Sequence, residues 1–224
     1  KYKNVNSIRF KGLSVHIGSQ ILSNVPYQKM IRVVSSFVEK VSVNFEYVDF
    51  GGGMGIDYAS NKKTFDFKKL AIEINKFSKR NECKIILEPG RSIIGDTAVL
   101  ISRVIYIKEN LNKDFIILDA GMNDLIRPAL YNAKHLIIPA NKSSKKSKKE
   151  YDFVGPICET SDRFLKMKKF QKLNEGDIVI LKDVGAYGYV LSSNYNVRPM
   201  PKEVLVDKSK TQVISKRQSI KDLI

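Results

Sequence analysis

Three short stretches of the sequence place residue types that can do chemistry directly after an apolar run. SVHIGSQ carries His16 and Ser19, and YVDFGGGMGIDY places four glycines in five positions. KIILEPGRSIIG runs from apolar residues into Glu88, Gly90 and Arg91. Consecutive glycines let backbone N–H groups approach an anion without a Cβ in the way, and a phosphate monoester is a good candidate for that anion.

The glycine stretch matches neither of the common nucleotide-binding fingerprints. Position 56 is Ile where the dinucleotide motif G-x-G-x-x-G requires glycine, and no Gly-Lys-Ser/Thr follows as in a P-loop. Two interpretations therefore stay open for the glycines alone, an anion site or a tight turn that lets the strand approach a neighbour. For Glu88 and Arg91 the alternative to an active site is a surface ion pair on a turn.

The elements that must position these residues alternate between strands and helices in the first half of the chain. Hydrophobic periodicity predicts strands at 8–17, 45–50 and 84–88, with helices at 24–41 and 66–80 between them. Such alternation favours parallel strands with helical crossovers, whose carboxyl ends meet at one edge. His16, Gly51 and Glu88 should then surround one pocket. Three strands cannot close an eight-stranded barrel, so this half is either a small doubly wound sheet or the last part of a larger barrel.

The second half of the chain has a different character, with short strands and few helical residues. Apolar patterns predict an antiparallel β domain that begins near 95–97, with short helical pieces around 123–131 and 188–193. Its expected strands are 97–107, 114–120, 135–140, 151–157, 177–184 and 212–216.

Composition excludes several classes of protein. The 224 residues contain 43% hydrophobic and 28% charged side chains, which is typical of a globular chain. No apolar run is long enough to span a membrane, and two cysteines do not make a disulfide framework, so a cytoplasmic protein is predicted. The net charge of +16 invites a nucleic-acid role, but the densest lysine cluster, at 141–150, lacks interleaved aromatic residues. We therefore predict no nucleic-acid partner and no metal site.

Taken together, the longer motifs resemble the diaminopimelate decarboxylases, fold-type III enzymes that use pyridoxal 5′-phosphate. The motifs occur in order over essentially the whole chain: HIGSQ, YVDFGGGMGIDY, EPGRSIIG, DAGMNDLIRPALY, VGPICETSD and DVGAYGYVLSSNYNVRPMPKEVLV. The resemblance implies that residues 1–96 form the C-terminal part of a parallel β/α (TIM-type) barrel. Residues 97–224 would form an antiparallel β-barrel-like domain, whose final helix at about 218–224 packs back on the barrel.

The resemblance also implies a role for each candidate residue around the cofactor. His16 would stack on the pyridine ring, Glu88 would keep the ring nitrogen protonated, and Tyr187 would reach the cofactor. The cofactor phosphate would be held by a group of glycines and polar residues, namely Gly51, Gly52, Gly53, Ser19, Gly90 and Arg91.

On the substrate side, the resemblance implies a homodimer that converts meso-2,6-diaminopimelate to L-lysine and CO₂, the last step of lysine biosynthesis. Arg91, Arg127 and Tyr131 would bind the carboxylate at the far end of the substrate. Cys158 and Glu159 would enter the site of the neighbouring subunit, Glu159 to receive the distal ammonium and Cys158 as a candidate proton donor. An inert buried thiol is the alternative for Cys158. Two further residues without a matching motif, Cys83 and His135, are interpreted as structural.

One family motif has no counterpart in this sequence. The lysine that forms a Schiff base with the cofactor lies near the start of the complete enzymes, and no lysine here has a matching context. We therefore expect an N-terminally truncated chain that is inactive alone. Two alternatives stay open: a related decarboxylase of ornithine, arginine or a carboxylated polyamine, and a non-catalytic fragment that pairs with a full-length homologue.

Overall fold

The computed structural model describes residues 7–41, 43–58 and 64–224. The chain divides into two compact units, Lys1–Gly95 and Asp96–Ile224, which we call unit 1 and unit 2. The division falls one residue before the position expected from the sequence. No helix among the described residues has both the length and the apolar character that crossing a bilayer would require.

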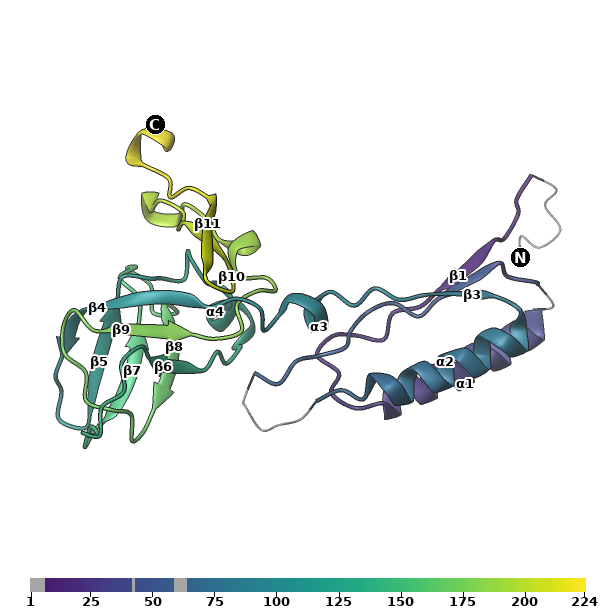
Figure 1. Cartoon of the computed structure of the whole chain (residues 1–224), viewed down its shortest axis with the longest axis horizontal. Helices are drawn as coiled ribbons and strands as arrows, with labels where there is room; N and C mark the ends of the chain where they lie inside the picture. The colour runs from purple at the N-terminus through teal and green to yellow at the C-terminus, as the bar shows by residue number, and fades with distance from the viewer. Residues whose placement is uncertain (1–6, 42, 59–63) are drawn as a thin grey trace. The chain divides into compact units, whose positions relative to one another are not determined.

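Unit 1 contains a three-stranded sheet in the order β1-β2-β3 (Figure 1). Both strand pairs are parallel, as the alternation of strands and helices predicted. The strands are shorter than expected, with three residues each: β1 (Gly12–Ser14), β2 (Tyr47–Asp49) and β3 (Lys84–Ile86). The connections contain α1 (Val25–Val41) and α2 (Phe67–Asn81), and α3 (Arg91–Ile94) follows β3.

Local sequence signals explain where the two long helices begin and end. Pro26 occupies the first turn of α1, where its missing N–H costs nothing. The side chain of Asp66 caps α2 by accepting a 2.9 Å hydrogen bond from the amide of Lys69. Glu82 ends α2 in the left-handed conformation, with φ of 49°.

The two helices pack against one face of the unit 1 sheet. Val48 in β2 is 1% exposed and belongs to the same core cluster as the buried side chains of α1 and α2. Alternation along a strand sends the neighbouring side chains to the opposite face. There Tyr47 is 38% and Ile86 is 42% exposed, so an apolar face of the sheet is left largely uncovered.

Unit 2 is built on a six-stranded sheet in the order β6-β9-β4-β5-β7-β8 (Figure 1). Its strands are β4 (Leu100–Lys108), β5 (Lys113–Leu118), β6 (Ile137–Pro139), β7 (Glu150–Val154), β8 (Arg163–Met167) and β9 (Ile178–Leu181). The first half of β4 pairs with β9 and its second half pairs with β5, so this strand joins the two halves of the sheet.

The expectation of a purely antiparallel domain is wrong at one strand pair. Strands β5 and β7 are parallel, with Phe115 opposite Asp152, so the sheet is mixed. A parallel pair needs a long connection. The residues between β5 and β7 provide it and include α4 (Arg127–Tyr131) and β6. Strand β8 was not expected from the sequence, because Lys166 interrupts its apolar residues.

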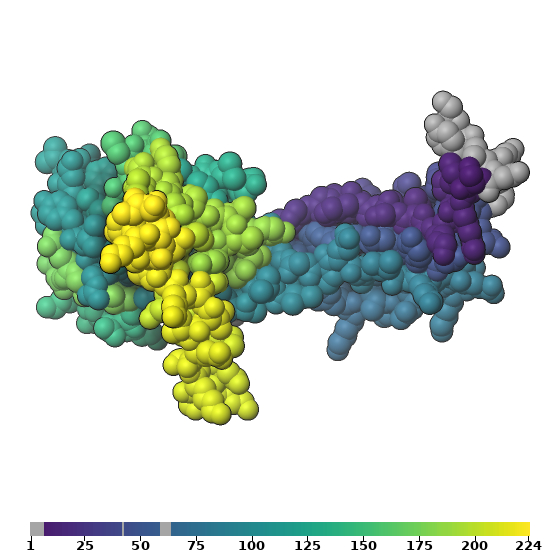
Figure 2. Space-filling model, turned by 90° about the horizontal axis from the view of Figure 1, so that it is seen from above, coloured from purple at the N-terminus to yellow at the C-terminus, as the bar shows by residue number. Residues whose placement is uncertain are grey.

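The C-terminal part of unit 2 is a hairpin of β10 (Glu203–Asp207) and β11 (Lys210–Ser215), preceded by two short 3₁₀ helices, η1 (Tyr189–Leu191) and η2 (Tyr195–Val197). The expected final helix at 218–224 is reduced to a single 3₁₀ turn, η3 (Ile220–Asp222), capped by Ser219. Figure 2 shows this C-terminal segment in yellow at the molecular surface.

Candidate active site

The carboxyl ends of the three parallel strands in unit 1 lie side by side. The strand register pairs Ser14 with Asp49 and Asp49 with Ile86. Backbone hydrogen bonds continue beyond the strands, from Val15 N–H to the Asp49 carbonyl oxygen (2.9 Å) and from Glu88 N–H to the Gly51 carbonyl oxygen (3.0 Å).

Extended by two residues, this register places His16, Gly51 and Glu88 in one row. The side chains of His16 and Glu88 are exposed, and Gly51 between them is buried. A carboxyl edge of parallel strands is where α/β proteins bind their ligands. The structure thus brings together the three strand ends that the sequence analysis singled out.

Neighbouring backbone atoms leave no room for a side chain at Gly51, Gly52 or Gly53. A Cβ added to Gly52 would lie 2.1 Å from the Glu88 carbonyl oxygen, and one on Gly53 would lie 2.1 Å from the Gly18 carbonyl oxygen. At Gly51 the nearest atom would be the Val15 carbonyl oxygen at 2.7 Å. Gly51 and Gly53 also have positive φ, of 65° and 97°. The close approach of the strand ends therefore accounts for these glycines, as the tight-turn interpretation expected, and the phosphate site stays a prediction.

The amide groups of the glycine stretch still offer hydrogen-bond donors. Gly51 N–H donates to Asp49 Oδ1 over 2.8 Å. Among the hydrogen bonds of the described residues, none has the N–H of Gly52 or Gly53 as its donor. Gly52 is buried and Gly53 is half-buried. Because an N–H shielded from water is costly without an acceptor, these two donors are suited to an anion.

The buried phenol of Tyr27 holds the glycine stretch in place. Its hydroxyl donates a 2.7 Å hydrogen bond to the Gly52 carbonyl oxygen. Burial raises the pKa of Tyr27 to about 12. Tyr27 therefore stays a neutral donor at ordinary pH and holds the Gly52 peptide in one orientation.

Arg91 connects two of the predicted site segments. One terminal nitrogen donates to Ser19 Oγ over 3.3 Å, and the other donates to the Tyr58 hydroxyl over 2.7 Å. The guanidinium carbon also lies 5.7 Å from the centre of the Tyr58 ring. A Cβ on Gly90, the residue before Arg91, would meet no atom within 4 Å. Ser19, Gly90 and Arg91 thus provide an open, positively charged corner beside the strand ends, and Tyr58 is a contact that the sequence analysis missed.

The remaining predicted residues belong to unit 2. Arg127 begins α4 and is 6% exposed, whereas Tyr131, one turn later on the same side of the helix, is 65% exposed. Arg127 donates from one terminal nitrogen to Nε2 of His135 over 2.8 Å. His135 is buried, which agrees with its interpretation as a structural residue, and Arg127 is a hydrogen-bond partner that the sequence did not indicate. Cys83 is likewise buried, in the core of unit 1.

Cys158 and Glu159 lie on a loop that Asp162 organises. The Asp162 carboxylate accepts 2.7 Å hydrogen bonds from the amides of Ile157 and Met122, and it fills the space where a Cβ of Gly155 would lie. Burial raises the pKa of Asp162, although these amide bonds oppose the shift. Cys158 is an exposed free thiol, so the alternative of an inert buried thiol is wrong.

Glu159 lies beside a hollow of about 430 Å³ in unit 2. The Tyr195 hydroxyl donates a 2.6 Å hydrogen bond to Glu159 Oε1. This bond raises the pKa of Tyr195, because deprotonation would place a phenolate against the carboxylate. The lining combines this carboxylate with hydroxyl, amide and apolar groups from Met122, Asn123, Ile126, Ser161, Ser193 and Tyr195. Such a lining is suited to an ammonium group on an aliphatic chain.

Backbone strain accompanies the placement of Tyr195. Asn196 and Val197 both have φ of 55°, which is costly for a β-branched residue such as Val197. Arg198 holds the segment by donating to Asn123 Oδ1 (3.1 Å) and to the Asp119 carbonyl oxygen (2.5 Å). Tyr187, which was predicted to reach the cofactor, is 43% exposed and also has positive φ, of 59°.

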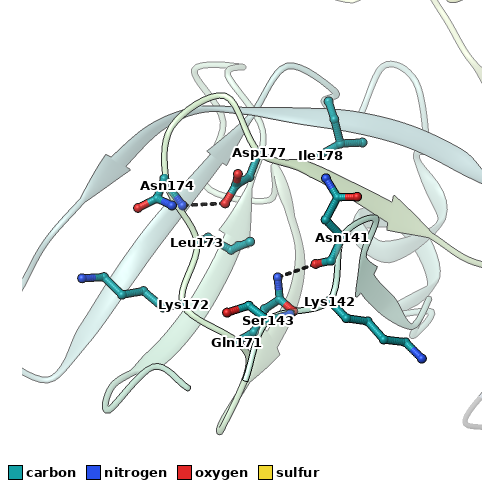
Figure 3. A pocket seen from close by; sticks show the side chains of 9 residues that line it. All are labelled: Asn141, Lys142, Ser143, Gln171, Lys172, Leu173, Asn174, Asp177 and Ile178. Carbon is teal, nitrogen blue, oxygen red and sulfur yellow. Dashed lines mark hydrogen bonds between the residues drawn. The ribbon is translucent and has the colours of Figure 1, made fainter. Parts of the chain in front are cut away.

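A second hollow in unit 2, of about 170 Å³, lies away from every predicted site residue (Figure 3). Gln171 closes one side by donating to the Asn141 carbonyl oxygen (2.8 Å) and accepting from the Ser143 amide (2.9 Å). Asp177 accepts from the Asn174 amide over 2.8 Å. These polar groups bond to one another, so the hollow is a stabilised loop junction at the start of β9.

Comparison with known proteins identifies the family to which the chain belongs. The family model described as "Pyridoxal-dependent decarboxylase, C-terminal sheet domain" matches residues 21–185. A diaminopimelate decarboxylase of Aquifex aeolicus is 41% identical over 218 residues, which cover 96% of this chain and 52% of the relative. One of Archaeoglobus fulgidus is 42% identical, over 95% of this chain and 52% of the relative.

A solved structure gives the same result for the fold. The crystal structure of diaminopimelate decarboxylase from M. jannaschii in complex with L-lysine superimposes with a TM-score of 0.89 and 35% identity, covering 95% of this chain and 50% of that one. The chain belongs to the pyridoxal-dependent decarboxylase family. It spans about half the length of the curated relatives it matches.

Proposed function

We propose that this chain forms the phosphate site and the substrate-recognition segments of a pyridoxal 5′-phosphate-dependent diaminopimelate decarboxylase. That enzyme converts meso-2,6-diaminopimelate to L-lysine and CO₂. The observation that carries the proposal is the row of His16, Gly51 and Glu88 at the aligned ends of three parallel strands.

The residues of unit 1 fit the phosphate and the ring of the cofactor. The N–H groups of Gly52 and Gly53, the Ser19 hydroxyl and the Arg91 guanidinium together supply donors for a dianion. We assign Glu88 to keep a ring nitrogen protonated and His16 to stack its flat ring on the cofactor. When bound, the cofactor supplies an electron sink for the carbanion left by decarboxylation.

Unit 2 supplies groups that match the two ends of the substrate. Arg127 and Tyr131, on one side of α4, are assigned to the distal carboxylate, which a planar guanidinium binds well. Glu159 is assigned to the distal ammonium, and the exposed Cys158 thiol to proton donation after CO₂ leaves. Tyr187 is assigned to contact with the cofactor.

Two features support a larger barrel and a homodimer. Strands β1 and β3 are the edges of the unit 1 sheet, and parallel sheets normally have both faces covered. The hairpin β10–β11 exposes apolar side chains on both strands, Val206 among them at 65%. We assign the sheet to a β/α barrel and the dimer interface to unit 2, with Cys158 and Glu159 entering the partner's site.

Decarboxylation requires a lysine that this chain does not supply in a recognisable motif. We therefore expect the 224-residue polypeptide to bind the cofactor without turning over diaminopimelate. Pairing with a longer homologue stays compatible with this proposal. A preference for ornithine or arginine is not favoured, because relatives that are 41% and 42% identical to this chain are named diaminopimelate decarboxylases.

A complementation experiment tests the proposal. The segment of the Aquifex aeolicus relative that has no counterpart in this chain would be co-expressed with it, and lysine formation from diaminopimelate measured with added pyridoxal phosphate. We expect activity from the pair and none from either part. A matched pair carrying Glu88→Gln should bind the cofactor and lose most activity. A co-purified, saturated pair without any turnover would overturn the proposed function.

A further inference from the structure

Arg127 and His135 form a fully buried pair in unit 2. Their exposed fractions are 6% and 1%. A terminal nitrogen of Arg127 lies 2.8 Å from His135 Nε2, and the other ring nitrogen, Nδ1, lies 2.9 Å from the Lys182 carbonyl oxygen. Each nitrogen of the His135 ring is thus hydrogen-bonded, one to a group that can only donate and the other to a group that can only accept.

The chemistry of these two neighbours fixes the protons of the ring. A guanidinium has only N–H donors, so Nε2 must accept its hydrogen bond and carries no proton. A carbonyl oxygen can only accept, so Nδ1 must carry the proton and donate it. His135 is therefore neutral and held in the single tautomer with the proton on Nδ1.

Secondary structure holds His135 rigidly at this position. Lys182 N–H donates to the Leu136 carbonyl oxygen over 2.9 Å, which continues the β6–β9 ladder to the residue beside His135. Arg127, by contrast, begins the five-residue helix α4, which is too short to be stable by itself. The imidazole therefore links a side chain on a short helix to the edge of the sheet.

We propose that His135 is a positioning residue, which holds the Arg127 guanidinium in the orientation that binds the distal carboxylate of the substrate. The inference rests on the proposed function, which assigns that carboxylate to Arg127. A planar guanidinium recognises a carboxylate through two parallel N–H groups, so its rotation has to be fixed. His135 Nε2, by accepting from one terminal nitrogen of Arg127, fixes the rotation of the guanidinium and leaves the positive charge of the guanidinium intact.

Nitrogen NMR of the imidazoles tests the pair directly. The chain has only two histidines, so the His16→Gln variant assigns both rings. We expect His135 at neutral pH to show a protonated Nδ1 and an unprotonated Nε2, and we expect the Nε2 resonance to move in Arg127→Leu. A doubly protonated ring, or a proton on Nε2, would overturn the proposal.

Ligand titration tests the positioning role separately from turnover. With meso-diaminopimelate as the probe, the His135 Nε2 resonance should shift, whereas cadaverine, which has the amines but no carboxylate, should leave it unchanged. His135→Leu should weaken diaminopimelate binding about tenfold, the equivalent of about 1.4 kcal/mol. His135→Gln, which keeps a neutral acceptor, should restore most of the affinity.

The outcomes separate the inference from the proposed function. Unchanged diaminopimelate affinity in a folded His135→Leu chain, or no binding to the wild-type chain, would overturn the positioning role. If His135→Leu fails to fold, the comparison of His135→Gln with wild type and the wild-type NMR shift decide. In the complemented enzyme, His135→Leu should raise KM with a smaller effect on kcat. A complemented pair that binds as expected but has no activity would overturn only the proposed function.

Discussion

The hydroxyl of Tyr195 donates a 2.6 Å hydrogen bond to Oε1 of Glu159, across 36 residues of sequence. Tyr195 is followed directly by Asn196 and Val197, which form a strained, left-handed turn. Local backbone strain of this kind persists only where surrounding contacts hold the segment in place. Here Arg198 provides two such contacts, its hydrogen bonds to Asn123 and to the Asp119 carbonyl oxygen. The pairing fixes the orientation of the carboxylate that we assign to ammonium recognition.

Replacing Glu159 by Gln should lower the pKa of Tyr195 toward its ordinary value of 10.0, because the carboxylate that opposes phenolate formation is gone. A pH titration of tyrosine ring carbons, with Tyr195→Phe to assign the signal, measures this change. An unchanged Tyr195 titration in Glu159→Gln would contradict the pairing.

Gly52→Ala should destabilise unit 1, because the new Cβ would lie 2.1 Å from the Glu88 carbonyl oxygen and push apart two strand ends. Overpacking of this kind costs about 1–3 kcal/mol. Gly90→Ala is the matched control, since a Cβ there meets no atom within 4 Å and the backbone φ is −81°. Chemical denaturation of the two variants measures the difference. Equal stabilities would show that the strand ends do not approach as closely as described.

Tyr27→Phe should cost about 1–3 kcal/mol of unfolding free energy, because the buried Gly52 carbonyl loses its donor. It should also change the pH dependence. The pKa of Tyr27 is about 12 in the folded chain and 10.0 in a free tyrosine, so its contribution is complete below pH 10 and is lost as the pH rises toward 12.

The difference in stability between wild type and Tyr27→Phe, measured from pH 8 to 12, isolates this contribution from the titration of the lysines. The difference should shrink across the upper half of that range. A constant difference between wild type and Tyr27→Phe would mean that the phenol is accessible to hydroxide.

The two cysteines should react at very different rates with a thiol-alkylating reagent. Cys158 is exposed, whereas Cys83 is buried and burial raises its pKa, which lowers the fraction of reactive thiolate. Mass spectrometry of the native chain should find one modified thiol, at Cys158, and Cys158→Ser should remove the fast phase. Rapid modification of Cys83 before unfolding would contradict the described core.

How much the sequence could predict is best seen at particular residues. The helices α1 and α2 were predictable because their apolar spacing and their N-terminal residues, Pro26 and Asp66, are local signals. The parallel pairing of β5 with β7 was not, because it depends on how a long connection crosses the sheet. The strand β8 escaped notice because lysine interrupts its apolar pattern.

The candidate site divides in the same way. His16, the glycine stretch and Glu88 were found because they directly follow apolar strands, whose ends must meet at one edge when the strands are parallel. Tyr58, Asp162 and Tyr195 carry no such local mark, although each lies within a motif that drew attention for other reasons. Their roles come from contacts with Arg91, with the amides of Met122 and Ile157, and with Glu159.

The sequence by itself determined which residue types stand at the strand ends, because periodicity, capping and glycine content act over a few neighbouring residues. It also determined the family, through motifs that run along most of the chain. Only the tertiary structure decided why the glycines are needed and which partner His135 has. Both depend on backbone segments far apart in the chain approaching within hydrogen-bonding distance, and the energy of such contacts is set by packing rather than by local sequence.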